Sequence, residues 1–185
     1  MDNVAKAVKT LGGGGVIVYP TETVYGLGVD ALNEKAIEKI FAIKERKRGM
    51  AVSVAVSSIE MAMRFADVGE TAKKLFRGYT PGPLTLIVKN TSFPVSLTGG
   101  SGTIGIRIPD NETALSIMRD FDGPVTATSA NKHGNFPAKM IEEAKAQLRG
   151  EVDFYVDGGL CDGAPSTVYN CINGITVRRG AIRIQ

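Results

Sequence analysis

The stretch GGGGVIVYPTETVYGLG, residues 12–28, limits what this chain can fold into more than any other segment. Its apolar, β-branched run ends at Tyr19 and is closed by a proline, a pattern typical of a short strand buried on both faces of a sheet. A polar segment beginning at Thr21 follows, and then Gly26 and Gly28, where we expect a small ligand to approach bare backbone. Hydroxyls in such a segment also satisfy their own backbone, so it predicts either a simple turn or the floor of a binding site.

Helical and strand signals alternate along the rest of the sequence. The apolar residues of Asp2–Leu11 share one helical face, and Asn33 can cap a second helix that brings Lys44 out of the core at its end. Capping pairs and periodicity predict further helices after Ser57, over 70–77, from Asn111 to Phe121 and over 137–148. Apolar runs predict strands over 51–56, 103–108, 124–128, 152–156, 166–171 and 175–178, with Asn173-Gly174 as the turn of a terminal hairpin. The segment 79–88 predicts a turn through its two prolines that leads into a further apolar strand. Crossover helices combined with a hairpin imply an α/β fold in which helices flank a twisted mixed sheet.

Length and composition favour one globular domain over residues 1–185, because no linker divides the chain. The apolar fraction of 43% is ordinary for a folded protein, and no apolar run reaches the roughly 18 residues of a membrane helix. The N-terminal segment lacks the apolar core of a secretion signal, so we expect a cytoplasmic protein with no membrane partner. Cys161 and Cys171 predict free thiols, and a single histidine, His133, leaves no histidine-based metal cluster.

Positive charge is clustered, although the net charge is only +3. Four of the six residues in KERKRG, 44–49, are cationic, and Arg178 and Arg179 form a second pair. The helix dipole favours a cation in a last turn, but Arg46 lies beyond it, so the cluster predicts either a solvated charge run or an anion site. Arg107 lies within the apolar strand TIGIRI, where it either alternates outward to solvent or presents a fixed fork to a carboxylate or phosphate.

Hydroxyl and amide groups cluster where two predicted strands end. The segment Thr128–Asn131 repeats the chemistry of Thr21–Thr23, as a crevice at the strand ends requires. No GxGxxG or P-loop motif is present, and no close carboxylate pair stands out. This inventory suits polyanion binding and charge stabilisation, and nucleotidyl transfer from a triphosphate with Mg²⁺ is the natural reaction. The candidate residues are Thr21, Thr23, Lys44, Arg46, Thr103, Arg107, Ser129, Asn131, Ser166, Thr167 and Arg178.

Several motifs in a fixed order, PTETVYGLG, KER, TPGPLTLIV, TIGIRIPD, TSAN, PSTV and VRRG, resemble the YrdC family of threonylcarbamoyl-AMP synthases, from about Gly13 to Arg183. The resemblance implies a single YrdC-like domain with a basic concave cleft. It implies that L-threonine, bicarbonate and ATP are joined to give threonylcarbamoyl-AMP and pyrophosphate, with Mg²⁺ arriving with ATP. A downstream threonylcarbamoyl transferase complex would then deliver the group to adenosine 37 of tRNA.

The same resemblance assigns site residues motif by motif. The family's K-x-R signature falls on Lys44 and Arg46, and its S-x-N signature falls on Ser129 and Asn131. All four are expected to be catalytic and to bind the ATP phosphates. The other expected contacts are those of Thr103 and Arg178 with ATP, and those of Thr21, Arg107 and Ser166 with threonine. An arginine fork is suited to the carboxylate of an amino acid.

The chain departs from the family's usual pattern near the site. Relatives commonly read KGRP in the signature loop, with a later proline, whereas Glu45, Lys47 and Ala51 occupy those places here. Ala55 stands where many members have a histidine near threonine, and Phe136 stands where a serine often contacts nucleotide. We expect the more charged loop to hold ATP differently, and we expect the short, single-domain form of the family.

Two other functions fit parts of the sequence. A non-enzymatic RNA-binding protein would use the basic residues, and weak contact with tRNA or double-stranded RNA fits the same family, but aromatic residues for base stacking are sparse at the basic cluster. The second is a carbamoyl-AMP-forming enzyme of the hydrogenase-maturation type, whose related domain normally belongs to a much larger chain. Pyrophosphate release that requires threonine distinguishes the synthase from both.

Overall fold

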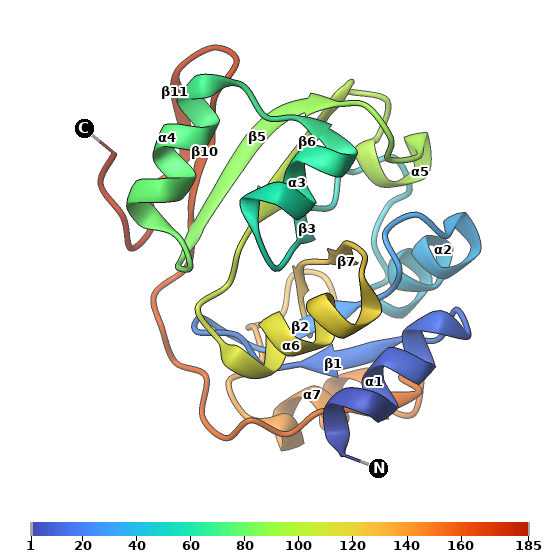
Figure 1. The fold of residues 1–185 in the computed structure, drawn as a ribbon. Coiled ribbons are helices and arrows are strands. Elements are labelled where there is room, and N and C mark those ends of the chain that lie inside the picture. The colour runs from blue at the N-terminus through green and yellow to red at the C-terminus, as the bar shows by residue number, and fades with distance from the viewer. Residues whose placement is uncertain (1, 185) are drawn as a thin grey trace.

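The computed structural model describes residues 2–184, in which helices alternate with short strands (Figure 1). The helices are α1 (Asn3–Gly12), α2 (Glu34–Ile43), α3 (Ile59–Phe65), α4 (Glu70–Tyr79), α5 (Val95–Thr98), α6 (Glu112–Phe121) and α7 (Ile141–Leu148). The strands are β1 (Ile17–Tyr19), β2 (Gly26–Gly28), β3 (Val54–Ala55), β4 (Ala66–Asp67), β5 (Leu84–Asn90), β6 (Thr103–Arg107), β7 (Val125–Thr126), β8 (Thr128–Ser129), β9 (Phe154–Tyr155), β10 (Thr167–Asn170) and β11 (Ile175–Arg178).

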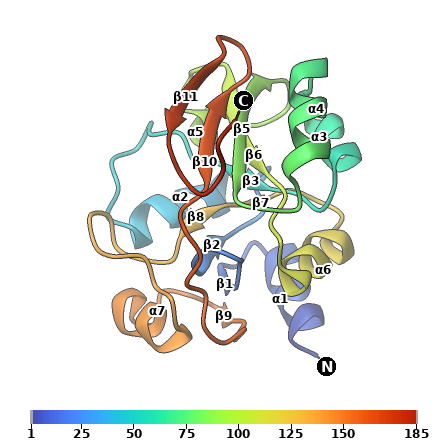
Figure 2. The same ribbon diagram turned by 90° about the vertical axis from the view of Figure 1, so that its left-hand side faces the viewer.

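Two mixed sheets carry the fold, one in the order β8-β2-β1-β9 and a larger one in the order β11-β10-β5-β6-β3-β7, with β4 paired to β5. In the smaller sheet β1 is antiparallel to β2 and parallel to β9, and in the larger sheet β5 is antiparallel to β6 and parallel to β10. Figure 2 shows α7 on one side of the smaller sheet and α1 and α6 on the other. The mixed α/β architecture and the terminal hairpin are therefore confirmed.

Side-chain caps explain why several helices begin where the sequence predicts. The side chains of Asp2, Asn33 and Asn111 each accept a hydrogen bond from the backbone N–H three residues further on, and so start α1, α2 and α6. The start of α3 was predicted one residue too early, because Ser58 rather than Ser57 accepts from the backbone of the first turn. Adjacent serines offer the same chemistry, and the backbone conformation selects the second.

The start of α7 is also later than predicted. The helix begins at Ile141 and not at Pro137. The Glu143 carboxylate accepts hydrogen bonds from the backbone N–H groups of Lys139 and Met140, which fixes the helix start at that point.

The predicted strand over 124–128 is two strands. Ala127 interrupts the run and donates its N–H to Ser53 O at 2.7 Å. As a result β7 belongs to the larger sheet and β8 to the smaller one. The chain therefore crosses between the sheets here, and this crossing places Ser129 at their junction.

Gly26 and Gly28 lie in β2 and not in an open loop. Gly26 lines a small cavity beside Thr21 and Arg107, so the approach of a ligand to its backbone stays a prediction, whereas Gly28 does not line that cavity. The Tyr19 ring packs against both, and a Cβ on either glycine would lie 2.8 Å from a ring atom. Tyr19 is fully buried, and its hydroxyl donates to Thr126 O at 3.0 Å. The two glycines therefore make room for a buried tyrosine.

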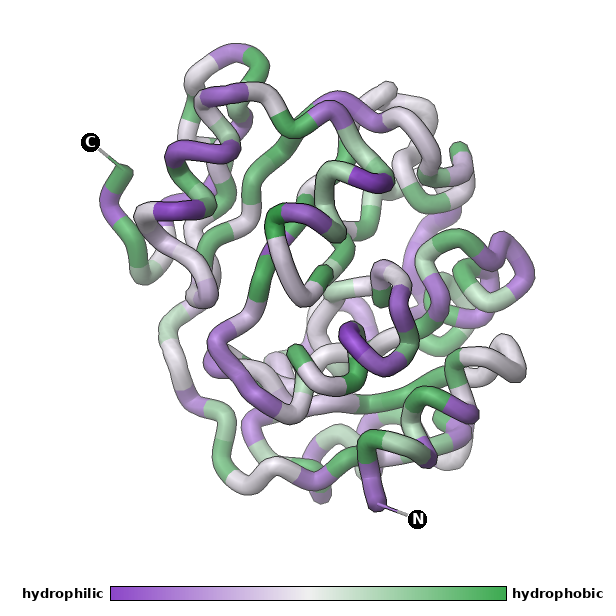
Figure 3. The backbone as a smooth tube through the Cα atoms, viewed as in Figure 1, coloured by the Kyte–Doolittle hydropathy of each residue, from purple (hydrophilic) through white to green (hydrophobic). Residues whose placement is uncertain are grey.

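Two groups of buried apolar side chains form the core, and β1 lies between them. Val18 faces the larger group, whereas Ile17 and Tyr19 face the smaller group under α1 and α6, so this strand is buried on both faces as predicted. In Figure 3 hydrophobic residues run along the strands, and hydrophilic residues mark the outer turns of α4. Of the described helices, none combines the length and apolar character needed to cross a membrane.

Candidate functional site

A cavity of about 350 Å³ is lined by residues of both sheets. Its walls come from the β1–β2 loop, the loop after α2, the junction of β7 and β8, and the ends of β6 and β11. The predicted site residues that line it are Thr23, Arg46, Arg107, Ser129, Ser166 and Arg178. Since these residues come from separate elements, the site is formed by the topology of the fold and not by any one sequence motif.

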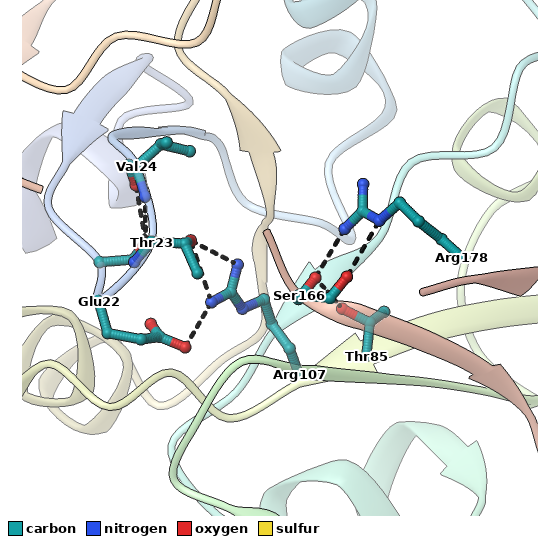
Figure 4. A network of polar contacts seen from close by, with 8 residues as sticks. Glu22, Thr23, Val24, Thr85, Arg107, Ser166 and Arg178 are labelled. Atoms are coloured by element: carbon teal, nitrogen blue, oxygen red, sulfur yellow. Dashed lines mark hydrogen bonds and ion pairs between the residues drawn. The ribbon is translucent and has the colours of Figure 1, made fainter. Parts of the chain in front are cut away.

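Arg107, at the end of β6, is 9% exposed and points toward the β1–β2 loop (Figure 4). Its NH2 group donates to Glu22 Oε1 at 2.7 Å, and NH1 lies 3.4 Å from Thr23 Oγ1. The interpretation in which Arg107 alternates outward to solvent is therefore wrong. A guanidinium fixed beside a cavity can bind a carboxylate or a phosphate.

Arg178, at the end of β11, is a second arginine fixed at the cavity (Figure 4). Its Nε donates to Ser166 O at 3.0 Å and its NH2 donates to Ser166 Oγ at 2.8 Å. Ser166 Oγ lies in turn 3.1 Å from Thr85 Oγ1. Burial lowers the pKa of the Arg178 guanidinium, and the positive charge of Arg107 lowers it further. Two like charges at one cavity favour an anion bound beside them.

Arg46 supplies a third positive charge from the loop after α2. Its NH2 donates to Ala51 O at 3.0 Å, while its Nε is buried without a hydrogen-bond partner among the described residues. The preceding residue, Glu45, has a φ of 52°, in the left-handed region that favours glycine. Lys132 Nζ holds this residue in place, lying 3.1 Å from Glu45 Oε1 and 2.8 Å from Glu151 Oε1. The loop is thus restrained by ion pairs.

Lys44 lies behind the cavity wall and supports the segment 129–131. Its Nζ donates to Ser129 O at 2.5 Å and to Asn131 O at 2.8 Å. The expectation that Lys44 leaves the core is wrong, because these carbonyl groups hold it inside, where it is 3% exposed. Burial, and then the charge of Arg46, lower the pKa of Lys44 to about 8. Asn131 closes its own loop by donating to two backbone carbonyl groups.

A smaller cavity of about 30 Å³ shares Arg107 and Ser129 with the larger one and is also lined by Thr21. Thr21 Oγ1 donates to Val24 O at 2.6 Å and lies 3.0 Å from Thr23 Oγ1. Both interpretations of this segment therefore hold, because its hydroxyls satisfy the turn and its residues also form cavity wall.

Thr103 lies at the other end of β6 from Arg107 and does not line the larger cavity in the described part of the chain. Its Oγ1 lies 3.0 Å from Ser101 Oγ. A Cβ on nearby Gly99 would collide with Gly49 O, so this loop packs against the loop after α2. Contact of Thr103 with ATP stays a prediction.

The polar network also contains Glu22 and Thr85, which the sequence did not lead us to assign to the site. Glu22 was recognisable as the sole carboxylate in the segment PTETVYGLG, and Thr85 as a hydroxyl inside the apolar strand LTLIV. Neither pattern is specific on its own, because the side chains that they contact come from distant parts of the sequence.

Comparisons with known proteins agree with this architecture. Residues 9–180 match the Sua5/YciO/YrdC family model, which carries the description telomere recombination. The threonylcarbamoyl-AMP synthase of Bacillus subtilis is 35% identical over 178 residues, 94% of this chain and 51% of that protein. That of Pseudoalteromonas translucida is 33% identical over 183 residues, 95% of this chain and 96% of that protein.

A solved structure has the same fold. The crystal structure of P. abyssi Sua5 complexed with L-threonine superposes with a TM-score of 0.88 at 32% identity, over 91% of this chain and 51% of that chain. The present chain thus spans about half the length of the B. subtilis and P. abyssi proteins and nearly all of the P. translucida protein.

Proposed function

This chain belongs to the Sua5/YciO/YrdC family, and from that premise we propose that it is a threonylcarbamoyl-AMP synthase. Such an enzyme is a nucleotidyltransferase that joins L-threonine, bicarbonate and ATP into threonylcarbamoyl-AMP and releases pyrophosphate. The names of relatives that match 94% and 95% of this chain support the activity, and a relative's structure in complex with L-threonine supports the amino acid.

The observation that carries the proposal is the convergence of Arg46, Arg107 and Arg178 on one cavity whose described lining contains no carboxylate. ATP brings a triphosphate, threonine a carboxylate, and bicarbonate a further negative charge. Partly buried cations attract such groups more strongly than cations at an open surface, because less water screens them. The site therefore fits three reactants that each carry a negatively charged group.

The reaction needs two bond-forming steps. First, the threonine amine nitrogen bonds to the carbon of bicarbonate, and water leaves to give a carbamate. Second, a carbamate oxygen bonds to the α-phosphorus of ATP, and the bond to the bridging oxygen breaks, so that pyrophosphate leaves. Fixed guanidinium groups can stabilise the charge that develops on the leaving phosphates.

We assign each substrate to a part of the cavity. Arg107, Ser166 and Thr21 would bind threonine, because the buried Arg107 guanidinium presents donors to a carboxylate. The residues assigned to ATP are Lys44, Arg46, Thr103, Ser129, Asn131 and Arg178. Lys44 would act chiefly by holding the Ser129–Asn131 segment, since its ammonium donates to backbone carbonyl groups there.

Mg²⁺ is proposed to enter with ATP. The described residues that line the cavity offer hydroxyl and guanidinium groups and no carboxylate, so the phosphate oxygens would be its main ligands. When bound, the ion would neutralise phosphate charge and assist departure of pyrophosphate.

The product would be used by a downstream threonylcarbamoyl transferase complex acting on tRNA adenosine 37. Threonylcarbamoyl-AMP is a mixed anhydride with AMP as leaving group, so a second enzyme with a nucleophilic acceptor must consume it. Weak direct contact with tRNA or double-stranded RNA is a separate proposal, and a salt-sensitive RNA affinity would support it.

The test is pyrophosphate release by purified protein with ATP and Mg²⁺, with L-threonine and bicarbonate added or omitted one at a time. The synthase is expected to release pyrophosphate only when both are present. Pyrophosphate release that does not depend on L-threonine would overturn the proposal. Absence of pyrophosphate release from folded protein that binds ATP would overturn it as well.

A further inference from the structure

The Glu22 carboxylate is buried beside the cavity, and the reaction as described gives it no role. Its Oε1 accepts a hydrogen bond from Arg107 NH2 at 2.7 Å, and the Glu22 and Arg107 side chains are 15% and 11% exposed. Arg107 and Thr23 line the cavity, whereas Glu22 does not. In Figure 4 Glu22 lies on one side of the Arg107 guanidinium, and Ser166 and Arg178 lie on the other.

Stability alone does not account for this ion pair. The cost of removing two charges from water offsets most of their attraction when a pair is buried. This pair is also incompletely bonded, because Glu22 Oε2 and Arg107 Nε are buried without a hydrogen-bond partner among the described residues. Two apolar side chains of similar size would avoid both costs.

Glu22 partly neutralises one of the three arginines at the cavity and leaves the other two fully charged. Among the described residues, Arg107 has a carboxylate partner, while Arg46 and Arg178 donate only to carbonyl and hydroxyl oxygens. A paired guanidinium keeps its other N–H donors but attracts a triphosphate less strongly than an unpaired one. The arrangement thus leaves Arg107 suited to a singly charged carboxylate.

We propose that Glu22 is a positioning residue, which fixes the Arg107 guanidinium for the carboxylate of the amino-acid substrate and keeps it from binding the phosphates of ATP. This inference rests on the proposed function, because it deepens the assignment of Arg107 to threonine. Without Glu22, the side chain of Arg107 retains, among the described residues, only the long contacts of 3.4 and 3.5 Å to Thr23 Oγ1, and its guanidinium can turn toward the triphosphate.

The test measures binding of L-threonine and of ATP separately by titration calorimetry. Glu22→Ala is expected to weaken L-threonine binding by ~10-fold or more, the loss of a charge-assisted contact, and to leave ATP binding as tight as in the wild type or tighter. Glu22→Gln should recover most of the L-threonine affinity, because its amide oxygen still accepts from Arg107. Inorganic triphosphate should compete with L-threonine in Glu22→Ala and not in the wild type.

A double-mutant cycle decides whether Glu22 acts through Arg107. The double variant Glu22→Ala/Arg107→Met should bind L-threonine with the same affinity as the single variant Arg107→Met. A further loss in that background would overturn the inference, as would equal losses of L-threonine and ATP affinity in the single variant.

Glu22→Asp keeps the inference testable if Glu22→Ala does not fold. Aspartate retains the charge but is one methylene shorter, so it cannot hold Arg107 from the same backbone position. We expect several-fold weaker L-threonine binding with ATP binding preserved, and unchanged L-threonine affinity would overturn the inference. Failure of the proposed function is recognised separately, because the wild type would then release no pyrophosphate in response to L-threonine.

Discussion

Replacing Lys44 with methionine is expected to reduce activity strongly while changing stability little. The lysine ammonium is buried without a carboxylate partner in the described part of the chain, and it donates to Ser129 O at 2.5 Å and to Asn131 O at 2.8 Å. Methionine has a similar length, so the substitution removes the charge and both hydrogen bonds and leaves little empty space.

Two opposing contributions set the change in the free energy of unfolding. Burial, together with the charge of Arg46, lowers the pKa of Lys44 from 10.5 to about 8, which at neutral pH corresponds to a cost of roughly 3 kcal/mol for keeping the ammonium charged at this position. Methionine removes that cost, but Asn131 O loses its partner at a cost of about 1–3 kcal/mol. Ser129 O still accepts from Asn131 N at 3.0 Å. The sum is near zero, within about 2 kcal/mol.

Turnover should fall by about 10- to 100-fold in Lys44→Met, because Ser129 lines the cavity and its segment loses its support. In the wild type, the stability contribution of Lys44 and the activity should change in opposite directions as the pH rises. The pKa of Lys44 is lower in the folded chain than in the unfolded chain, so between about pH 8 and pH 10.5 the unfolded chain binds more protons and the stability contribution of Lys44 rises. Activity that needs the charged ammonium falls over the same range.

The assay is pyrophosphate release across this pH range, together with urea unfolding at neutral and alkaline pH. Lys39→Met is the matched control, since Lys39 lies on α2, the helix that Lys44 directly follows, and its Nζ donates to a backbone carbonyl, Gly14 O, at 2.7 Å at the surface. Wild-type turnover in Lys44→Met would refute the reasoning. Persistence of the alkaline loss of activity in that variant would show that another group titrates.

Further substitutions test other parts of the structure. Arg107→Leu should weaken L-threonine binding far more than ATP binding in calorimetry, whereas equal losses would indicate a purely structural arginine. Gly26→Ala should lower the melting temperature by the equivalent of about 1–3 kcal/mol, because its Cβ would meet the Tyr19 ring at 2.8 Å, while Gly78→Ala, inside α4 with open space around its Cβ, should not lower it. Lys132→Ala should cost no more than about 1 kcal/mol at low salt and less at high salt, and a larger or salt-independent loss would contradict a surface ion pair.

Helix starts were predictable from sequence because their signals are local. Asp2, Asn33 and Asn111 each accept from a backbone N–H three residues away, so no tertiary contact is needed to recognise them. The strand over 124–128 was less predictable, because its break depends on the hydrogen bond from Ala127 N to Ser53 O. The partner of that bond lies in a different predicted strand, and no pattern within the segment identifies it.

Hydrophobic periodicity could not predict that the side chains of Arg107 and Lys44 are buried. An arginine in an alternating strand can face either way, and Arg107 turns inward because Glu22, 85 residues away in sequence, holds it there. Lys44 likewise turns inward because Asn131, 87 residues away, supplies a carbonyl group. Helical position alone placed Lys44 at a helix end, where a cation is usually solvated. Contacts of such long range are decided by how the two sheets meet.

The same long-range contacts give the proposed reaction its geometry. Ser166 was assigned to threonine and Arg178 to ATP from separate motifs, and nothing in the sequence relates the two positions in space. In the structure Arg178 NH2 donates to Ser166 Oγ at 2.8 Å, so the groups assigned to the two substrates touch each other. The second step requires this adjacency, because the carbamate formed on threonine must reach the α-phosphorus of ATP. Substitution of Ser166 is therefore expected to impair the coupling of the two substrates as well as threonine binding.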